Sequence, residues 1–205
     1  MAVQYTNRIG KTYYLREGQT KTGKPRYFFS AQKEGKGKIL EHVPDGYEIY
    51  EHPQNAQVFL RKKRLQLITD IEKYLVEKYA KMLAGARQYR VDYKDEYITV
   101  YESDVNAEEL KGVFGNLLED IPLRPGVTAD DALNTLVSSV DRNYSAMLRF
   151  RLMDEERRTF TAERFCFRGS IDDWIFLAGP SDLKSLVEKY MKFLGTEAFF
   201  DLPFS

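Results

Sequence analysis

Apolar and polar side chains alternate along the segment from Tyr144 to Leu152. An apolar residue at every second position is typical of a β-strand with one buried face. Two more strands are predicted over 159–167 and 173–178. Ser181 can then cap a helix whose apolar stripe consists of Leu183, Leu186, Val187, Tyr190, Met191 and Leu194. This part of the chain is therefore predicted to be an antiparallel meander covered by an amphipathic helix.

The first 64 residues contain short strand-forming segments separated by turns. The predicted strands, which are rich in aromatic and β-branched residues, are 12–16, 25–30, 47–51 and 58–61. Gly23 and the sequence Pro44-Asp45-Gly46 mark turns between them. Residues 34–38 are predicted to be a flexible, exposed loop. The pattern indicates an antiparallel β module.

Helical periodicity begins after the basic run Arg61–Arg64. Over 65–86, the apolar residues that fall on one helical face are Ile68, Ile71, Leu75, Tyr79 and Met82. A strand pair is predicted over 90–101, and Asn106 and Thr128 can each cap another helix. The chain is thus predicted to be an α+β protein with three parts: the β module at 1–64, a linking amphipathic helix at 65–86 and an α+β domain at 87–205.

Charge is distributed unevenly between the two ends of the chain. In total there are 31 Lys and Arg and 31 Asp and Glu, so the formal net charge is zero. Residues 1–64 carry 13 basic and 6 acidic side chains, a net charge of +7, and residues 65–205 carry 18 and 25, a net charge of −7. Two explanations are open: the opposite charges help the two parts dock, or the basic part binds an anionic ligand.

Several classes of function are disfavoured by the residues that the chain lacks. Cys166 is the single cysteine, which excludes an internal disulfide and a cysteine-based zinc site. His42 and His52 are the two histidines, and neither lies in a recognisable catalytic or metal-binding motif. These features favour a protein that is not an enzyme and holds no metal or cofactor, although carboxylates from distant positions could still assemble a site. No apolar run reaches the roughly 18–20 residues of a membrane span and no signal peptide is recognisable, so we expect a cytoplasmic protein without membrane association.

Basic and aromatic residues are interleaved in the N-terminal β module. A sheet of this composition can stack bases on its rings and pair phosphates with Lys and Arg. The residues that we predict to contact nucleic acid are Arg16, Lys21, Lys24, Arg26, Tyr27 and Phe29. The alternative is that the aromatic side chains form the core of a small sheet and the lysines lie on its solvated face.

Two features of the C-terminal part predict a protein partner instead. Arginines at alternate positions of two neighbouring strands would form a cationic face if the strands align: Arg149, Arg151, Arg164 and Arg168. The apolar tail could also dock a partner through Phe199, Phe200 and Phe204. Surface ion pairs, and a tail that folds back on the body, are the alternatives.

Four runs resemble stretches of a family of uncharacterised bacterial proteins: Gly23–Ser30, Pro44–Glu51, Val58–Arg61 and Ser170–Trp174. The resemblance implies a bacterial protein, and it carries over no functional residue because the family has no assigned activity. The residues themselves favour a cytoplasmic binding or adaptor protein whose partner is nucleic acid or another protein, and they leave its oligomeric state open.

Overall fold

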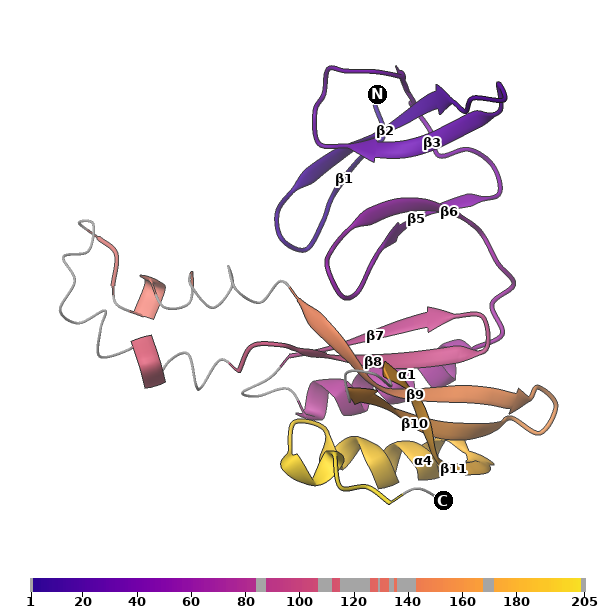
Figure 1. The fold of residues 1–205 in the computed structure, drawn as a ribbon, viewed down its shortest axis with the longest axis vertical. Coiled ribbons are helices and arrows are strands. Elements are labelled where there is room, and N and C mark those ends of the chain that lie inside the picture. The colour runs from indigo at the N-terminus through magenta and orange to yellow at the C-terminus, as the bar shows by residue number, and fades with distance from the viewer. Residues whose placement is uncertain are drawn as a thin grey trace. The chain divides into compact units, whose positions relative to one another are not determined.

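The computed structural model of the protein describes residues 2–83, 88–106, 112–114, 126–128, 130–132, 135, 143–167 and 172–203. The chain divides into two compact units, Met1–Leu65 and Gln66–Ser205. Antiparallel sheets occur together with helices (Figure 1), which confirms the predicted α+β class. Among the described residues, the first unit contains a four-stranded sheet and a two-stranded sheet, and the second unit contains a five-stranded sheet.

The described part of the first unit consists of strands joined by turns and loops. β2 is the central strand of an antiparallel sheet and pairs with the three others. The strands of this sheet are β1 Gln4–Thr6, β2 Thr12–Gln19, β3 Pro25–Ser30 and β4 Lys38–Ile39. A separate antiparallel hairpin consists of β5 Tyr47–Glu51 and β6 Val58–Lys62. The four predicted strands are therefore confirmed, and β1 and β4 are additional.

Aromatic packing connects the sheet of the first unit to its hairpin. The ring of Tyr27 in β3 meets the ring of Tyr47 in β5 edge-on, with 5.3 Å between the centroids. Leu15 in β2 is fully buried, as is expected for the one small core that a unit of this size can build.

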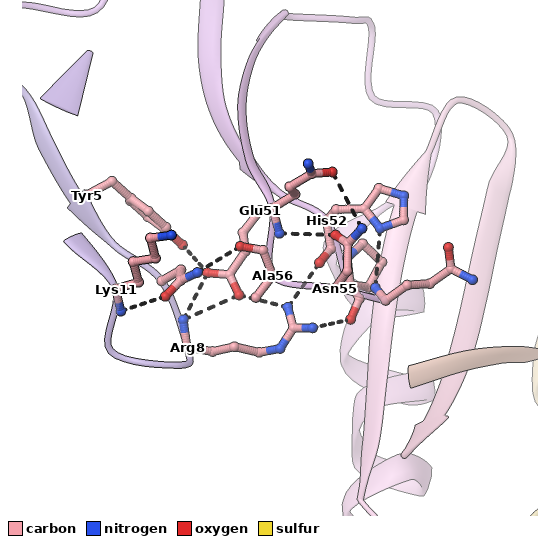
Figure 2. A network of polar contacts seen from close by, with 11 residues as sticks. Tyr5, Arg8, Lys11, Glu51, His52, Asn55 and Ala56 are labelled. Atoms are coloured by element: carbon pink, nitrogen blue, oxygen red, sulfur yellow. Dashed lines mark hydrogen bonds and ion pairs between the residues drawn. The ribbon is translucent and has the colours of Figure 1, made fainter. Parts of the chain in front are cut away.

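A largely buried ion pair makes a second connection within this unit (Figure 2). Arg8, in the turn after β1, donates from Nη1 to Glu51 Oε1 at 2.8 Å and to the carbonyl oxygen of His52 at 2.9 Å. Its Nη2 donates to the carbonyl oxygen of Pro53 at 2.6 Å, and Tyr5 Oη donates to Glu51 Oε2 at 3.1 Å. The side chains of Arg8 and Glu51 are 10% and 14% exposed. This Arg8–Glu51 network ties the β1–β2 turn to the β5–β6 turn.

The second unit is a five-stranded antiparallel sheet in the order β11-β10-β9-β8-β7. Its strands are β7 Tyr89–Lys94, β8 Tyr97–Ser103, β9 Tyr144–Asp154, β10 Thr159–Phe167 and β11 Asp172–Asp182. Its helices are α1 Asp70–Leu83 and α4 Leu183–Tyr190, with the 3-10 helices η1 Met191–Phe193 and η2 Glu197–Phe199. The predicted meander and its covering helix are confirmed, and β7 and β8 form the hairpin predicted over 90–101.

β11 is longer than the sequence predicts. Ser181, predicted to cap the last helix, lies within the strand and pairs with Phe160. The cap is Asp182 instead, whose Oδ1 accepts a hydrogen bond from the backbone N–H of Ser185 at 2.9 Å. Gly179 allows the strand to continue, because its φ is +125° and a Cβ there would lie 2.6 Å from the carbonyl oxygen of Phe160.

Helices α1 and α4 pack on the same face of this sheet (Figure 1). The helix predicted within 65–86 therefore contributes to the second unit, where Val76 and Ala80 are buried. Core residues supplied by the strands include Ile98, Val100, Leu148, Phe150 and Phe160. The helices predicted after Asn106 and Thr128 lie largely outside the described residues.

Candidate ligand-binding surfaces

Arg16 does not lie on a binding surface, contrary to the sequence-based prediction. The residue is 3% exposed. Its guanidinium donates to backbone carbonyl oxygens of the loop 32–37, with the shortest bonds to Lys33 at 2.5 Å, Gly37 at 2.8 Å and Gly35 at 3.0 Å. A buried guanidinium whose Nη1 and Nη2 both donate to backbone carbonyl oxygens is not available to pair with a phosphate.

The aromatic candidates are separated from the basic ones by the register of β2 and β3. Phe29 pairs with the buried Leu15, and Tyr27 lies on the same face, where its ring packs on Tyr47. Arg26 pairs with Gly18 on the opposite face, which is the face of Arg16. Tyr27 and Phe29 are half-buried and lie on the face opposite Arg26, so they do not form a stacking platform together with the basic residues.

The Arg16 network shapes an exposed basic surface around it. Gly37 has a φ of +87°, and a Cβ at this position would lie 2.8 Å from the carbonyl oxygen of Glu17 and 3.2 Å from Phe28 Cζ. The loop 32–37 therefore passes directly over this face of the sheet. Five cationic side chains of the loop and the adjacent β2–β3 hairpin are exposed, and we call them the basic surface: Lys21, Lys24, Arg26, Lys33 and Lys36.

The basic run at the end of the first unit is partly engaged in structure. Arg61 Nε donates to Glu48 Oε1 at 2.6 Å, and its guanidinium lies 3.9 Å from the centroid of the Tyr50 ring. Lys62 and Lys63 are exposed. Part of this run thus stabilises the β5–β6 hairpin, as expected for a strand end.

The predicted cationic face of the second unit does not form as one surface. Arg149 of β9 lies directly opposite Glu163 of β10 and forms an ion pair with it. Arg164 instead lies opposite the buried Leu148, on the face that carries the helices, and is 5% exposed. The error is one of parity, because neighbouring residues of a strand point to opposite faces. Arg168 is outside the described residues.

Arg149 and Arg151 lie among aromatic rings on the face opposite the helices. The guanidinium of Arg149 is 4.6 Å from the ring centroid of Tyr97 and 4.3 Å from that of Trp174. Arg151 pairs with Glu96 at 3.6 Å. Further aromatic residues of this face are partly exposed, among them Phe167 at 48% and Phe176 at 40%. We call this the aromatic face of the second unit.

The C-terminal tail folds back on the second unit. Phe199 is fully buried in the core, whereas Phe200 is 47% exposed. Phe204 lies outside the described residues. A groove of about 310 Å³ opens between this tail and the ends of β8 and β9. Sequence reasoning missed the groove, although one signal was present: Glu102 has the same strand parity as the buried Ile98 and Val100.

Potential metal ligands do not gather in the described part of the chain. No group of three or more His, Cys, Asp or Glu side chains there could hold a metal ion. The thiol of Cys166 is buried. Burial, together with the charge of Asp92, raises the pKa of Tyr101 to about 12, so the Tyr101 hydroxyl stays neutral near pH 7. Over the same residues, no helix is both long and apolar enough to cross a membrane.

Comparison with known proteins gives no match: no family model, no curated protein and no solved structure is significantly similar to the chain.

Proposed function

We propose that the protein is a non-enzymatic, cytoplasmic binding protein whose N-terminal unit contacts the phosphate backbone of nucleic acid through the basic surface. The observation that carries this proposal is the Arg16 network. The buried guanidinium draws backbone carbonyl oxygens of the loop 32–37 inward, and Lys33 and Lys36 of that loop are exposed. The carbonyl oxygens, which would repel phosphate, are therefore turned away from solvent, whereas the side chains of Lys33 and Lys36 face solvent.

The charge of the unit favours a polyanion. Residues 1–64 have a net charge of +7, and the basic surface concentrates five cations over one loop and one hairpin. Glu34, in the same loop, is the acidic residue that interrupts them. Binding driven by charge is strongest where phosphates are densest, so duplex should bind more tightly than a single strand.

The mode of contact is sequence-independent. Tyr27 and Phe29 lie on the face of the sheet opposite Arg26, so they do not stack bases beside the basic surface. Lys and Arg then supply backbone contacts alone, and such contacts position a protein without reading bases.

Fluorescence anisotropy of labelled duplex and single-stranded oligonucleotides tests the proposal. Lys24→Ala with Arg26→Ala, and separately Lys33→Ala with Lys36→Ala, should each weaken binding at least about tenfold, because each removes two phosphate contacts. Lys184→Ala with Lys192→Ala is the matched control, since it removes two exposed charges from the second unit. Equal losses in the control, or no binding by the wild type at low salt, would overturn the proposal.

Lys62→Ala with Lys63→Ala separates the two basic regions of the first unit. Both lysines are exposed and lie outside the basic surface. We expect this variant to bind within about twofold of the wild type after allowance for the loss of net charge. If it loses binding while the Lys24/Arg26 and Lys33/Lys36 variants keep it, the run at 61–64 is the contact instead.

A second candidate function is protein docking at the aromatic face of the second unit. The stacking of Arg149 between Tyr97 and Trp174, beside the exposed Phe176, favours it, because Trp, Tyr and Arg dominate the binding energy of protein interfaces. Phe176→Ser should abolish retention of a partner in affinity capture, while Phe59→Ser, at a 42% exposed phenylalanine of the first unit, should not. Identical capture by the two variants would exclude this face.

A further inference from the structure

Helix α1 has a second apolar face, and this face is exposed. Val76 and Ala80 of the helix are buried in the core of the second unit. Ile71, Tyr74 and Met82 are instead 81%, 68% and 69% exposed. At 3.6 residues per turn, these three side chains fall within a sector of about 80° on the side of the helix away from Val76 and Ala80. One apolar face is enough to cover a sheet, so the second face is available as a contact surface.

The exposed face contains a hole of the kind that receives a side chain from another helix. Its volume is about 330 Å³, and the described residues that line it are Tyr74, Glu77, Lys78, Lys81 and Met82. The first four are spaced i, i+3, i+4 and i+7, the arrangement that surrounds an inserted side chain where two helices pack knobs into holes. Tyr93 holds one wall in place, because its Oη donates to Glu77 Oε1 at 2.9 Å. This face therefore fits a helix.

The charges along this face are complementary to a second copy of the same helix. Asp70 lies at the N-terminal end of α1 and its side chain is 97% exposed. Lys78 and Lys81 lie in the C-terminal half and are also exposed. If a second copy runs antiparallel, its lysines come beside Asp70, and two-fold symmetry repeats the pairing at the other end. A parallel copy would bring like charges together instead.

We propose that a second copy of this chain docks on this face, so that two α1 helices pack antiparallel about a two-fold axis. Ile71 of each copy enters the hole of the other, and Asp70 of each copy pairs with Lys78 and Lys81 of the other. The contact is one helix of 14 residues per copy, about 21 Å long, so the interface is small and its dissociation constant is micromolar. This dimer contact belongs to the second unit and is independent of the nucleic-acid contact proposed for the first.

Sedimentation velocity of the full chain, at protein concentrations from about 5 to 500 μM, tests the apolar part of the contact. The wild type should shift from monomer to dimer as its concentration rises. Ile71→Ser should weaken dimerisation about tenfold or more, because it removes the side chain that enters the hole. Met153→Ser is the matched control, at a 52% exposed residue of β9, and should dimerise like the wild type. A wild type that stays monomeric at the highest concentration, or equal dimerisation of Ile71→Ser and Met153→Ser, would overturn the proposal.

Reversed charges test the antiparallel orientation. Asp70→Lys, and separately Lys78→Glu with Lys81→Glu, should each weaken dimerisation about tenfold or more, because like charges then meet at both ends of the contact. An equimolar mixture of these two variants should dimerise about as strongly as the wild type, since every contact again joins a lysine to a carboxylate.

Controls separate this result from effects on net charge and folding. Lys184→Glu with Lys192→Glu reverses two exposed lysines outside α1 and should leave dimerisation unchanged. Asp70→Lys and Ile71→Ser change exposed side chains, so the midpoints of unfolding in denaturant, followed by Trp174 fluorescence, should stay near that of the wild type. If the wild type dimerises but the mixture of charge-reversed variants stays monomeric, the antiparallel pairing is wrong.

Discussion

The loop 32–37 should lose its structure when Arg16 is removed. In Arg16→Ala, the five carbonyl oxygens that accept from the guanidinium lose their charged donor. Removing one partner of a buried charged contact costs about 3–5 kcal/mol. Because the loop can move into solvent and hydrate its carbonyl groups, we expect the lower value, about 3 kcal/mol of stability lost from the first unit.

Arg16→Lys separates the charge of the side chain from its geometry. Lysine keeps the positive charge, but it lacks the planar fork that reaches Lys33 and Gly37 at the same time. We therefore expect an intermediate loss of about 1.5–2 kcal/mol. Arg26→Ala is the matched control, since Arg26 is an exposed arginine on the same face of the sheet, and it should change stability by less than about 0.5 kcal/mol.

Hydrogen exchange measured by mass spectrometry follows the first unit directly. Amides of β2, β3 and the loop 32–37 should lose protection in Arg16→Ala and keep it in Arg26→Ala. Trp174 is the single tryptophan and lies in the second unit, so the midpoint of its fluorescence transition in denaturant should not change. Equal protection in Arg16→Ala and Arg26→Ala would refute the structural role assigned to Arg16.

Three further predictions follow from buried contacts of each unit. Glu51→Gln should destabilise the first unit by about 3 kcal/mol, because it leaves the Arg8 charge without its carboxylate. Adding Arg8→Met should recover part of this loss. Hydrogen exchange of β5 and β6 measures the stability of both variants, and a Glu51→Gln variant as stable as the wild type would contradict the prediction. Burial acts to raise the pKa of Glu72, but hydrogen bonds from Arg158 and Thr69 outweigh burial and hold this pKa below its usual value of 4.5. The stabilisation is therefore present above pH 4.5 and is lost as the pH falls through the lower pKa of Glu72 in the folded state. The free energy of unfolding, measured by Trp174 fluorescence in denaturant, should therefore fall less steeply below about pH 5 in Glu72→Gln than in the wild type. The same pH dependence in the two proteins would count against this prediction. Gly179→Ala should destabilise the second unit by about 2 kcal/mol or more, because the added Cβ would lie 2.6 Å from the carbonyl oxygen of Phe160. Gly112→Ala is the control and should not destabilise the unit, because a Cβ there meets nothing within 4 Å. Equal midpoints of unfolding in denaturant for the two variants, followed by Trp174 fluorescence, would refute this prediction.

Elements with a regular apolar repeat could be predicted from the sequence. The apolar face predicted for α1 was wrong in part, because Ile71 and Met82 are 81% and 69% exposed. The alternation from Tyr144 to Leu152 identified β9, and the stripe from Leu183 to Leu194 identified the covering helix. The start of that helix was misplaced at Ser181, because the pairing of Ser181 with Phe160 depends on the partner strand rather than on local pattern.

The candidate sites were harder to predict, since they depend on register and on loops. Arg149 and Arg151 share one face of β9, as their spacing predicts. The register between β9 and β10 puts Arg164 on the opposite face, and this register could not be read from either strand alone. Arg16 resembled a surface cation until the path of the loop 32–37 showed it to be buried. The position of Glu102 could have been noticed in the sequence, because an acidic residue is unusual at an inward position of a strand. The groove beside it could not be predicted, since the tail that completes it follows nearly 100 residues later in the chain.

The salt dependence of nucleic-acid binding tests the central proposal most directly. If the five cations of the basic surface each neutralise one phosphate, log Kd plotted against log salt concentration for duplex DNA should have a slope of about 4 to 4.5. Lys24→Ala with Arg26→Ala should lower this slope by about 1.8, and Lys184→Ala with Lys192→Ala should leave it unchanged. A slope near zero in the wild type, or the same slope in all three proteins, would contradict phosphate contact by the N-terminal unit.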